Sequence, residues 1–219
     1  MKLLKKKTIG FSAMTLVLLL SGCQSKDSGK EKTTTMAEIL NGKEERKIVM
    51  THDTQTYDSP DIYWAGTIGN GKMEIHPYKN LGKFEFNDVK NISMKEYKKL
   101  LSEKDREYSK KKGKKLDIYP VKAKIYYKAK DIENPRSLIF DYDAKFYSDE
   151  EKFSMINKGF SVIEKDHPDN WLCIRTRDDS GKGWTNDYVY VEAKNGEKNL
   201  EKDDLKKAMQ KYDNVKRIK

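Results

Sequence analysis

Apolar and polar side chains alternate along several short stretches of the chain, which is the pattern of half-buried β-strands. In the first half, this alternation predicts strands at residues 47–52, 62–68 and 72–78. Asn70-Gly71 lies between the last two, and this dipeptide favours a tight hairpin turn. Phe84-Glu85-Phe86 predicts a short fourth strand. The first half therefore predicts an antiparallel meander.

The second half contains more of these alternating stretches. Residues 121–129 alternate small or apolar side chains with lysines, and residues 138–146 alternate apolar side chains with aspartates. If the two stretches pair antiparallel, lysines face aspartates, and each such pair contributes a few tenths of a kcal/mol. Further strands are predicted at residues 160–164, 171–177 and 188–193, with loop 178–183 joining the last two as a hairpin.

Capping boxes mark two helix starts, because a Ser or Thr followed three residues later by Glu satisfies free backbone N–H groups. Thr35 with Glu38 predicts a short helix that Gly42 ends. Ser93 with Glu96 predicts a longer helix that runs to about residue 112.

A last helix is predicted from about residue 200 to residue 212, with Asn199 as its N-cap. Its apolar stripe consists of Leu205, Ala208, Met209 and Tyr212. Together the elements predict an α+β fold, in which antiparallel β-sheet meanders pack with two amphipathic helices, as two subdomains that meet near residue 115.

The N-terminus has a different pattern. Four lysines within residues 2–7 are followed by an apolar stretch at residues 9–20. This stretch is shorter than the roughly 20 apolar residues that a transmembrane helix needs, and it fits the core of a signal peptide. Leu20-Ser21-Gly22-Cys23 follows it.

These four residues look like the lipobox of bacterial lipoprotein precursors. The resemblance implies cleavage between Gly22 and Cys23 and a diacylglyceryl group on the sulfur of Cys23. It also implies a protein held on the extracytoplasmic face of the cell membrane by that lipid. Small residues at positions 21 and 22 fit the approach of a peptidase. The alternative interpretations are an ordinary secretory signal with a chance cysteine and an uncleaved anchor.

The domain organisation follows from these patterns. Residues 1–22 are expected to be a signal peptide, and residues 23–35 a flexible tether because residues 24–35 contain no apolar side chain. Residues 36–115 form an α+β subdomain that ends in a basic helix, and residues 116–219 form a β-rich subdomain with the C-terminal helix. Residues 36–43 resemble the start of uncharacterised small lipoproteins of Gram-positive bacteria, which implies no activity.

The net charge indicates what kind of partner the protein can bind. The formal net charge is +10, and removing residues 1–22, which contain four lysines and no acid, lowers it to +6. A basic protein outside the cell favours an anionic lipid or an anionic wall polymer over nucleic acid. Residues 95–115 alone hold ten Lys or Arg and four acids. The cluster that ends this segment is a candidate anionic-surface site: Lys110, Lys111, Lys112, Lys114 and Lys115. A solvated helix face is the equally plain alternative.

No enzyme motif survives inspection. Residues 66–72 resemble a phosphate-binding loop, but Met73 replaces the required Ser or Thr. His52, His76 and His167 are widely spaced and are expected at the surface, and there is no HExxH, CxxC or GxSxG motif. With Cys23 acylated, Cys173 is left without a disulfide partner. We therefore expect no catalytic residues, no metal and no cofactor.

Aromatic residues offer a second candidate surface. Trp171, Cys173 and Arg175 alternate on one predicted strand, and Trp184, Tyr188 and Tyr190 lie on or beside its partner. If these side chains are exposed, they would form a surface that binds another protein. If they are buried, they belong to the core, and we favour this second interpretation.

Two classes of function remain open. The first is a non-catalytic binding or interaction module, as immunity and exclusion lipoproteins are. The second is a precursor of a peptide pheromone, because the octapeptide Thr15 to Gly22 resembles apolar pheromones cut from lipoprotein signal peptides.

Overall fold

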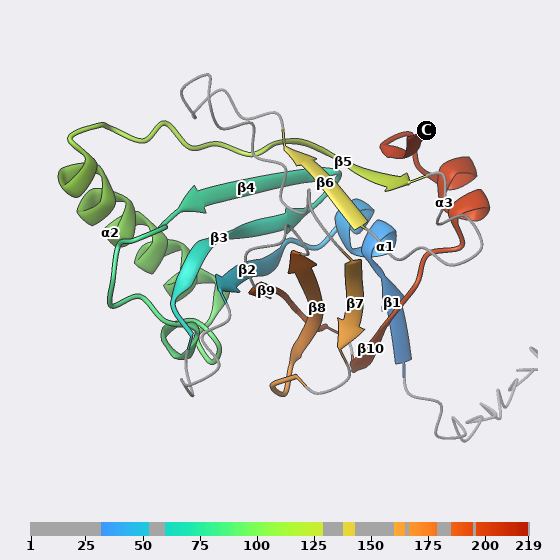
Figure 1. Ribbon diagram of the computed structural model, residues 1–219, viewed down its shortest axis with the longest axis horizontal. Helices are drawn as coiled ribbons and strands as arrows, with labels where there is room; N and C mark the ends of the chain where they lie inside the picture. The colour runs from blue at the N-terminus through green and yellow to red at the C-terminus, as the bar shows by residue number, and fades with distance from the viewer. Residues whose placement is uncertain are drawn as a thin grey trace, which may run out of the picture. The chain divides into compact units, whose positions relative to one another are not determined.

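Figure 1 shows a computed structural model, which describes residues 32–52, 60–128, 138–142, 160–164, 167–178, 185–194 and 196–218. Residues 31–219 form one compact unit. The predicted class is confirmed: the described residues form an α+β fold, with a mainly antiparallel sheet and three α-helices among them.

Nine strands form the main sheet, in the order β11-β5-β4-β3-β2-β9-β8-β7, with β6 paired to β5 outside this path. Strand β9 pairs with β2, and β5 pairs with β4, so strands from both sides of residue 115 lie in one sheet. The boundary expected near residue 115 therefore does not interrupt the sheet. The strands are β2 (Arg46–His52), β3 (Ile62–Gly69), β4 (Lys72–Pro77), β5 (Val121–Lys128), β6 (Leu138–Tyr142), β7 (Phe160–Glu164), β8 (Trp171–Asp178), β9 (Thr185–Glu192) and β11 (Val215–Ile218).

The predicted hairpins are confirmed. Asn70 and Gly71 join β3 to β4 with φ angles of 53° and 68°, the left-handed conformation that a tight hairpin turn requires. Strands β8 and β9 pair antiparallel, as do β5 and β6. Lys124 lies opposite Asp141 in the β5–β6 ladder, as the alternating charges predicted.

Two strand pairs are parallel, which the sequence did not indicate. Strand β11 pairs with β5, and β1 (Lys32–Thr35) pairs with β10 (Glu197–Glu201) in a separate two-stranded sheet. Residues 32–35 were assigned to the tether for lack of apolar side chains. Their backbone groups pair nonetheless, because a ladder is made by N–H and C=O groups.

The fourth predicted strand at residues 84–86 is wrong. Glu85 makes only an isolated bridge to Asp61, and Phe86–Asp88 form the 3-10 helix η1.

Both capping boxes are confirmed. They open α1 (Met36–Asn41) and α2 (Met94–Lys112), and Gly113 ends α2 with a φ of 66°. The last helix was predicted too long. Helix α3 covers only Leu205–Lys211, and its N-cap is Asp204 instead of Asn199, because residues 197–201 pair with β1 as strand β10.

Two hydrophobic cores lie on opposite faces of the sheet. Successive side chains of β2 point to opposite faces of the sheet, so Ile48 belongs to one core and Val49 to the other. Helices α1 and α3 pack in the first core, and α2 packs in the second. The core beneath α2 consists of Val49, Ile62, Ala65, Tyr78, Phe84, Phe86, Val89, Tyr97, Leu101 and Trp171.

Candidate functional site

Helix α2 carries the predicted basic cluster, and buried polar groups join it to the sheet. The Tyr97 hydroxyl lies 3.1 Å from the carbonyl oxygen of Ile48 and 3.0 Å from that of Gly66, and it accepts the Gly66 N–H at 2.9 Å. A Cβ atom at position 66 would lie 1.7 Å from the carbonyl oxygen of Glu74, so only glycine fits. Burial raises the pKa of Tyr97, so its hydroxyl stays protonated.

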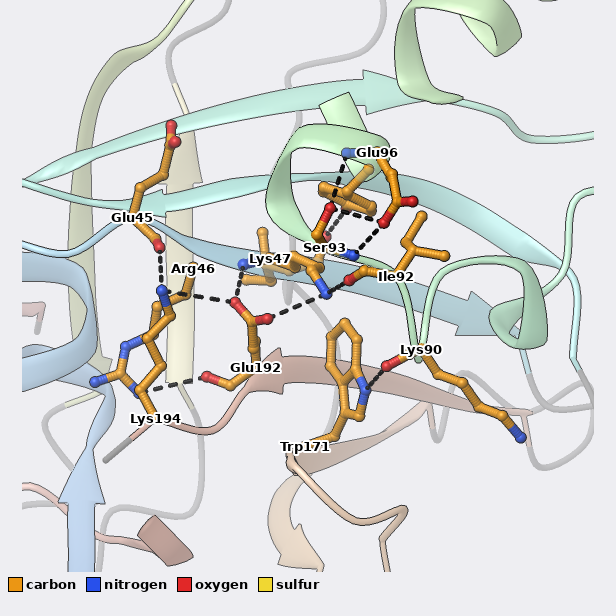
Figure 2. Close-up of polar contacts among 12 residues, drawn as sticks. Glu45, Arg46, Lys47, Lys90, Ile92, Ser93, Glu96, Trp171, Glu192 and Lys194 are labelled. Atoms are coloured by element: carbon orange, nitrogen blue, oxygen red, sulfur yellow. Dashed lines mark hydrogen bonds and ion pairs between the residues drawn. The ribbon is translucent and has the colours of Figure 1, made fainter. Parts of the chain in front are cut away.

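Lys47 is a second polar anchor, and it is 3% exposed. Figure 2 shows its ammonium group between the sheet and the segment that leads into α2. The group donates to the carbonyl oxygen of Ile92 and forms an ion pair with Glu192 at 3.1 Å. It lies 5.9 Å from the ring centre of Tyr97 and 5.7 Å from that of Trp171, within the range of cation–π attraction.

The segment before α2 is held at further points. The Trp171 indole N–H donates to the carbonyl oxygen of Lys90 at 3.1 Å (Figure 2). The backbone N–H of Ser93 donates to the Glu96 carboxylate at 2.9 Å, and the Glu96 N–H donates back to the Ser93 hydroxyl. The segment before α2 is therefore held to β8 by Trp171 and to β2 by Lys47, and the capping box fixes the first turn of the helix.

His76 forms a third anchor, from β4 to the middle of α2. Its Nδ1 lies 2.9 Å from the Asp105 carboxylate, and its Nε2 lies 3.1 Å from the Glu74 carboxylate. The Tyr78 hydroxyl donates to Asp105 at 2.8 Å. Burial alone would lower the pKa of His76, but the hydrogen bonds to Asp105 and Glu74 raise it above its ordinary value.

The five predicted lysines lie together at the C-terminal end of α2, and all are exposed. Lys110, Lys111 and Lys112 occupy the last helical turn, where a positive charge favours the helix dipole. After Gly113, the N–H of Lys114 donates to the carbonyl oxygen of Ser109 at 3.2 Å. The side chain of Lys112 lies over the ring of Tyr108, 5.6 Å from its centre.

Lys111 differs from the other four lysines of the cluster. Its ammonium group donates to the carbonyl oxygens of Asn80 and Leu81, the latter at 3.2 Å. It therefore holds the loop after β4 against the end of α2, and its role is in part structural.

The structure corrects the prediction of a surface position for one histidine, His76. His76 is buried, not at the surface, and β3 lies between its strand β4 and the strand β2 of His52. His167 lies 3.3 Å from the carbonyl oxygen of Pro168. Within the described ranges, no three His, Cys, Asp or Glu side chains converge as metal ligands.

A cavity of about 290 Å³ lies beside the β3–β4 hairpin, and it is partly open to solvent. Its two carboxylates already have partners: Glu45 pairs with Lys98 at 2.5 Å, and Glu74 pairs with His76. Thr67, which also lines the cavity, donates to Glu45 at 2.9 Å. This cavity offers polar contacts but no activated nucleophile among the residues that line it.

The aromatic strand contributes mainly to the core. Trp171 and Cys173 are buried on β8, whereas Arg175, Tyr188 and Tyr190 are half-buried. Trp184 lies outside the described residues. The interpretation of this set as core is thus confirmed for its two buried members.

Other buried polar groups were missed by sequence reasoning. Arg46 of β2 binds Glu197 of β10 through both carboxylate oxygens, one at 3.0 Å. The Tyr127 hydroxyl donates to Asp203, whose carboxylate also accepts the N–H of Ala37 at 3.2 Å. Burial raises the pKa of Asp203. In the sequence these residues resemble ordinary surface charges, and no local signal distinguishes them.

The residues of the predicted lipid anchor, Gly22 and Cys23, and the octapeptide Thr15 to Gly22 lie outside the described part of the chain. Among the helices that the structure describes, none is both long and apolar enough to cross a membrane. Comparisons with protein-family models, curated proteins and solved structures found no match.

Proposed function

We propose that the mature protein is a lipid-anchored binding module on the extracytoplasmic face of a bacterial membrane, with no catalytic activity. The observation that carries this proposal is Leu20-Ser21-Gly22-Cys23, directly after a lysine-rich start and an apolar stretch at residues 9–20. In this order they fit a signal peptide that ends in a lipidation site. Two acyl chains on Cys23 would give stable anchorage, because each buried CH₂ contributes about 0.8 kcal/mol.

Replacing Cys23 by Ala tests the anchor. Cells that express the wild type and are fed a clickable palmitate analogue should yield labelled protein in the membrane fraction. The Cys23→Ala variant should lose the label and leave that fraction. Cys173→Ala is the matched control, since Cys173 is buried in the core and should not be acylated. Undiminished label on Cys23→Ala would contradict the proposal.

The binding part of the proposal concerns the end of α2. Lys110, Lys111, Lys112, Lys114 and Lys115 are exposed, and no acidic residue lies between positions 108 and 116. Anchors along α2, at Tyr97 and at Asp105, hold the helix on the sheet, so the lysines stand on a rigid support. We propose that they contact an anionic surface. Such binding should weaken steeply with salt, because exposed charges are screened over about 8 Å at physiological ionic strength.

A further inference from the structure

The loop after β4 adds two lysines to the cluster at the end of α2. Residues 79–83 and 108–116 together contain seven lysines and no acid. All seven are exposed. We call this set the composite lysine patch: Lys79, Lys83, Lys110, Lys111, Lys112, Lys114 and Lys115.

Lys111 joins the two segments by donating to the carbonyl oxygens of Asn80 and Leu81. The loop is tightly turned, since Asn80, Gly82 and Lys83 have φ angles of 64°, 74° and 52°. The carbonyl groups of Asn80 and Leu81 therefore meet the helix end, and the loop adds the exposed Lys79 and Lys83 to the basic surface; the ammonium group of Lys79 lies 5.0 Å from the ring centre of Tyr63.

Tyr78 fixes both segments to a common support. It directly precedes the loop, and its hydroxyl donates to Asp105 of α2 at 2.8 Å. Its ring also packs edge to face against Tyr108 of α2, with 6.3 Å between ring centres. The lysines of loop and helix are thus held relative to each other in the absence of a ligand, which reduces the entropy lost on binding.

We propose that the composite lysine patch binds a linear polyanion with repeating phosphate groups. Lysine is a compact point charge that binds phosphate without fixed geometry, and neither segment of the patch contains an arginine. A row of lysines fits a flexible chain of charges better than a single shaped ligand. This phosphate site deepens the proposed contact with an anionic surface, and it does not rest on the proposed lipid anchor.

The test uses the full acylated protein, inserted into neutral phosphatidylcholine vesicles, with fluorescent inorganic polyphosphate as the probe. A helix variant carries Lys110, Lys112, Lys114 and Lys115 replaced by Gln, and a loop variant carries Lys79→Gln and Lys83→Gln. The control variant, Lys198→Gln with Lys206→Gln, removes two exposed lysines from β10 and α3. Circular dichroism confirms that each variant is folded.

We expect the helix variant to bind polyphosphate at least about 10-fold more weakly, which corresponds to about 1.4 kcal/mol. The loop variant should lose about 3-fold or more, and the control less than 2-fold, because steering by net charge alone is weak at physiological salt. Equal affinity of the loop variant and the control would overturn the composite patch.

A second arm separates a phosphate polymer from the lipids of the vesicle. Replacing part of the phosphatidylcholine by phosphatidylglycerol should leave polyphosphate binding within about 2-fold, if the patch selects a chain of phosphates over single headgroups. Loss of binding in these vesicles would show that anionic lipid occupies the patch and would overturn the proposal. The mass of the N-terminal peptide reports acylation separately. Absence of acyl groups from that peptide would contradict the lipid anchor but not the phosphate site.

Discussion

The two ends of α2 place lysine in opposite environments. Beneath the N-terminal end, Lys47 is buried against Glu192, the carbonyl of Ile92 and two aromatic rings. At the C-terminal end, five lysines are exposed and lie next to a loop with two more. Lys47 has its hydrogen-bond acceptor and its counter-ion inside the protein, whereas most of the exposed lysines place their charge in solvent.

This contrast shows that lysine content does not measure binding capacity. A buried ammonium group must be matched by internal partners, and it then fixes the elements that supply them. An exposed one contributes little to stability and remains available to a ligand. The sequence does not distinguish buried from exposed lysines. Only the position of each lysine relative to the sheet shows which kind it is.

The largest effect is expected for Lys47→Met, which keeps the apolar stem and removes the charge. The change removes the ion pair of Glu192 at 3.1 Å, leaving its weaker pair with Lys194 at 3.9 Å, and it removes the donor to the Ile92 carbonyl. We expect the free energy of unfolding to fall by about 3 kcal/mol, near the lower end for breaking a buried ion pair, because Glu192 is partly exposed. Urea denaturation followed by tryptophan fluorescence measures this.

The double variant Lys47→Met with Glu192→Gln sharpens the result. It removes both charges, so part of the lost stability should return relative to the single variant. As a matched control, Lys99→Met changes an exposed lysine of α2 and should alter the free energy of unfolding by less than about 0.5 kcal/mol. Similar losses at positions 47 and 99 would remove the distinction between the two environments.

Tyr97→Phe should have the second largest effect. The variant keeps the ring in the core but removes the hydroxyl that accepts the N–H of Gly66 and meets the carbonyls of Gly66 and Ile48. We expect a loss of about 2 kcal/mol, since these buried backbone groups lose the hydrogen bonds that they make with the hydroxyl. Hydrogen exchange measured by NMR should show faster exchange of the Gly66 amide. An unchanged exchange rate would mean that Tyr97 does not hold α2 on β3.

The sequence predicted the elements whose signals are local. The capping boxes at Thr35 and Ser93 and the Asn70-Gly71 turn act over four residues or fewer, and the structure has all three. The parallel pairs β1–β10 and β11–β5 join segments far apart in the chain. Nothing in residues 197–201 distinguishes a strand partner of β1 from the first turn of a helix, so the start of α3 was placed too early.

In the candidate site, too, the sequence predicted the features with a local signal and missed those that depend on distant residues. The run of basic residues after position 109 is visible in the sequence, and these residues are indeed exposed. The contribution of Lys79 and Lys83 was not visible, because the loop reaches the helix end only through Lys111 and Tyr78. The burial of His76 was also hidden, since its partner Asp105 lies 29 positions away on another element.

A smaller effect is expected from pH, through His76. Folding raises the pKa of this histidine, so its protonated form stabilises the folded state. That contribution is complete below about pH 6.5, the ordinary value for histidine, and is lost as pH rises through the raised pKa. Stability should therefore fall as the pH rises from about 6.5 through the raised pKa of His76, in urea titrations repeated at each pH.

His76→Gln should flatten this pH dependence, whereas His167→Gln should leave it in place. The neighbouring carboxylate of Glu74 does not interfere, because the hydrogen bond from His76 lowers its pKa and its own contribution is lost only in acid. Two-dimensional NMR of the imidazole ring gives the pKa directly. A value at or below the ordinary one would contradict the proposed anchor.

The smallest effect on stability is expected for the lysines that contribute most to binding. Replacing Lys110, Lys112, Lys114 and Lys115 by Gln removes exposed charges that lack a close acid within residues 108–116, so the free energy of unfolding should change by less than about 0.5 kcal/mol. Adding Lys111→Gln should lower it somewhat further, because the loop carbonyls of Asn80 and Leu81 then lose their donor. Thermal unfolding of the four-fold and five-fold variants measures this difference. If the four-fold variant alone unfolded as readily as Lys47→Met, the exposed lysines would be structural, and the contrast between the two ends of α2 would fail.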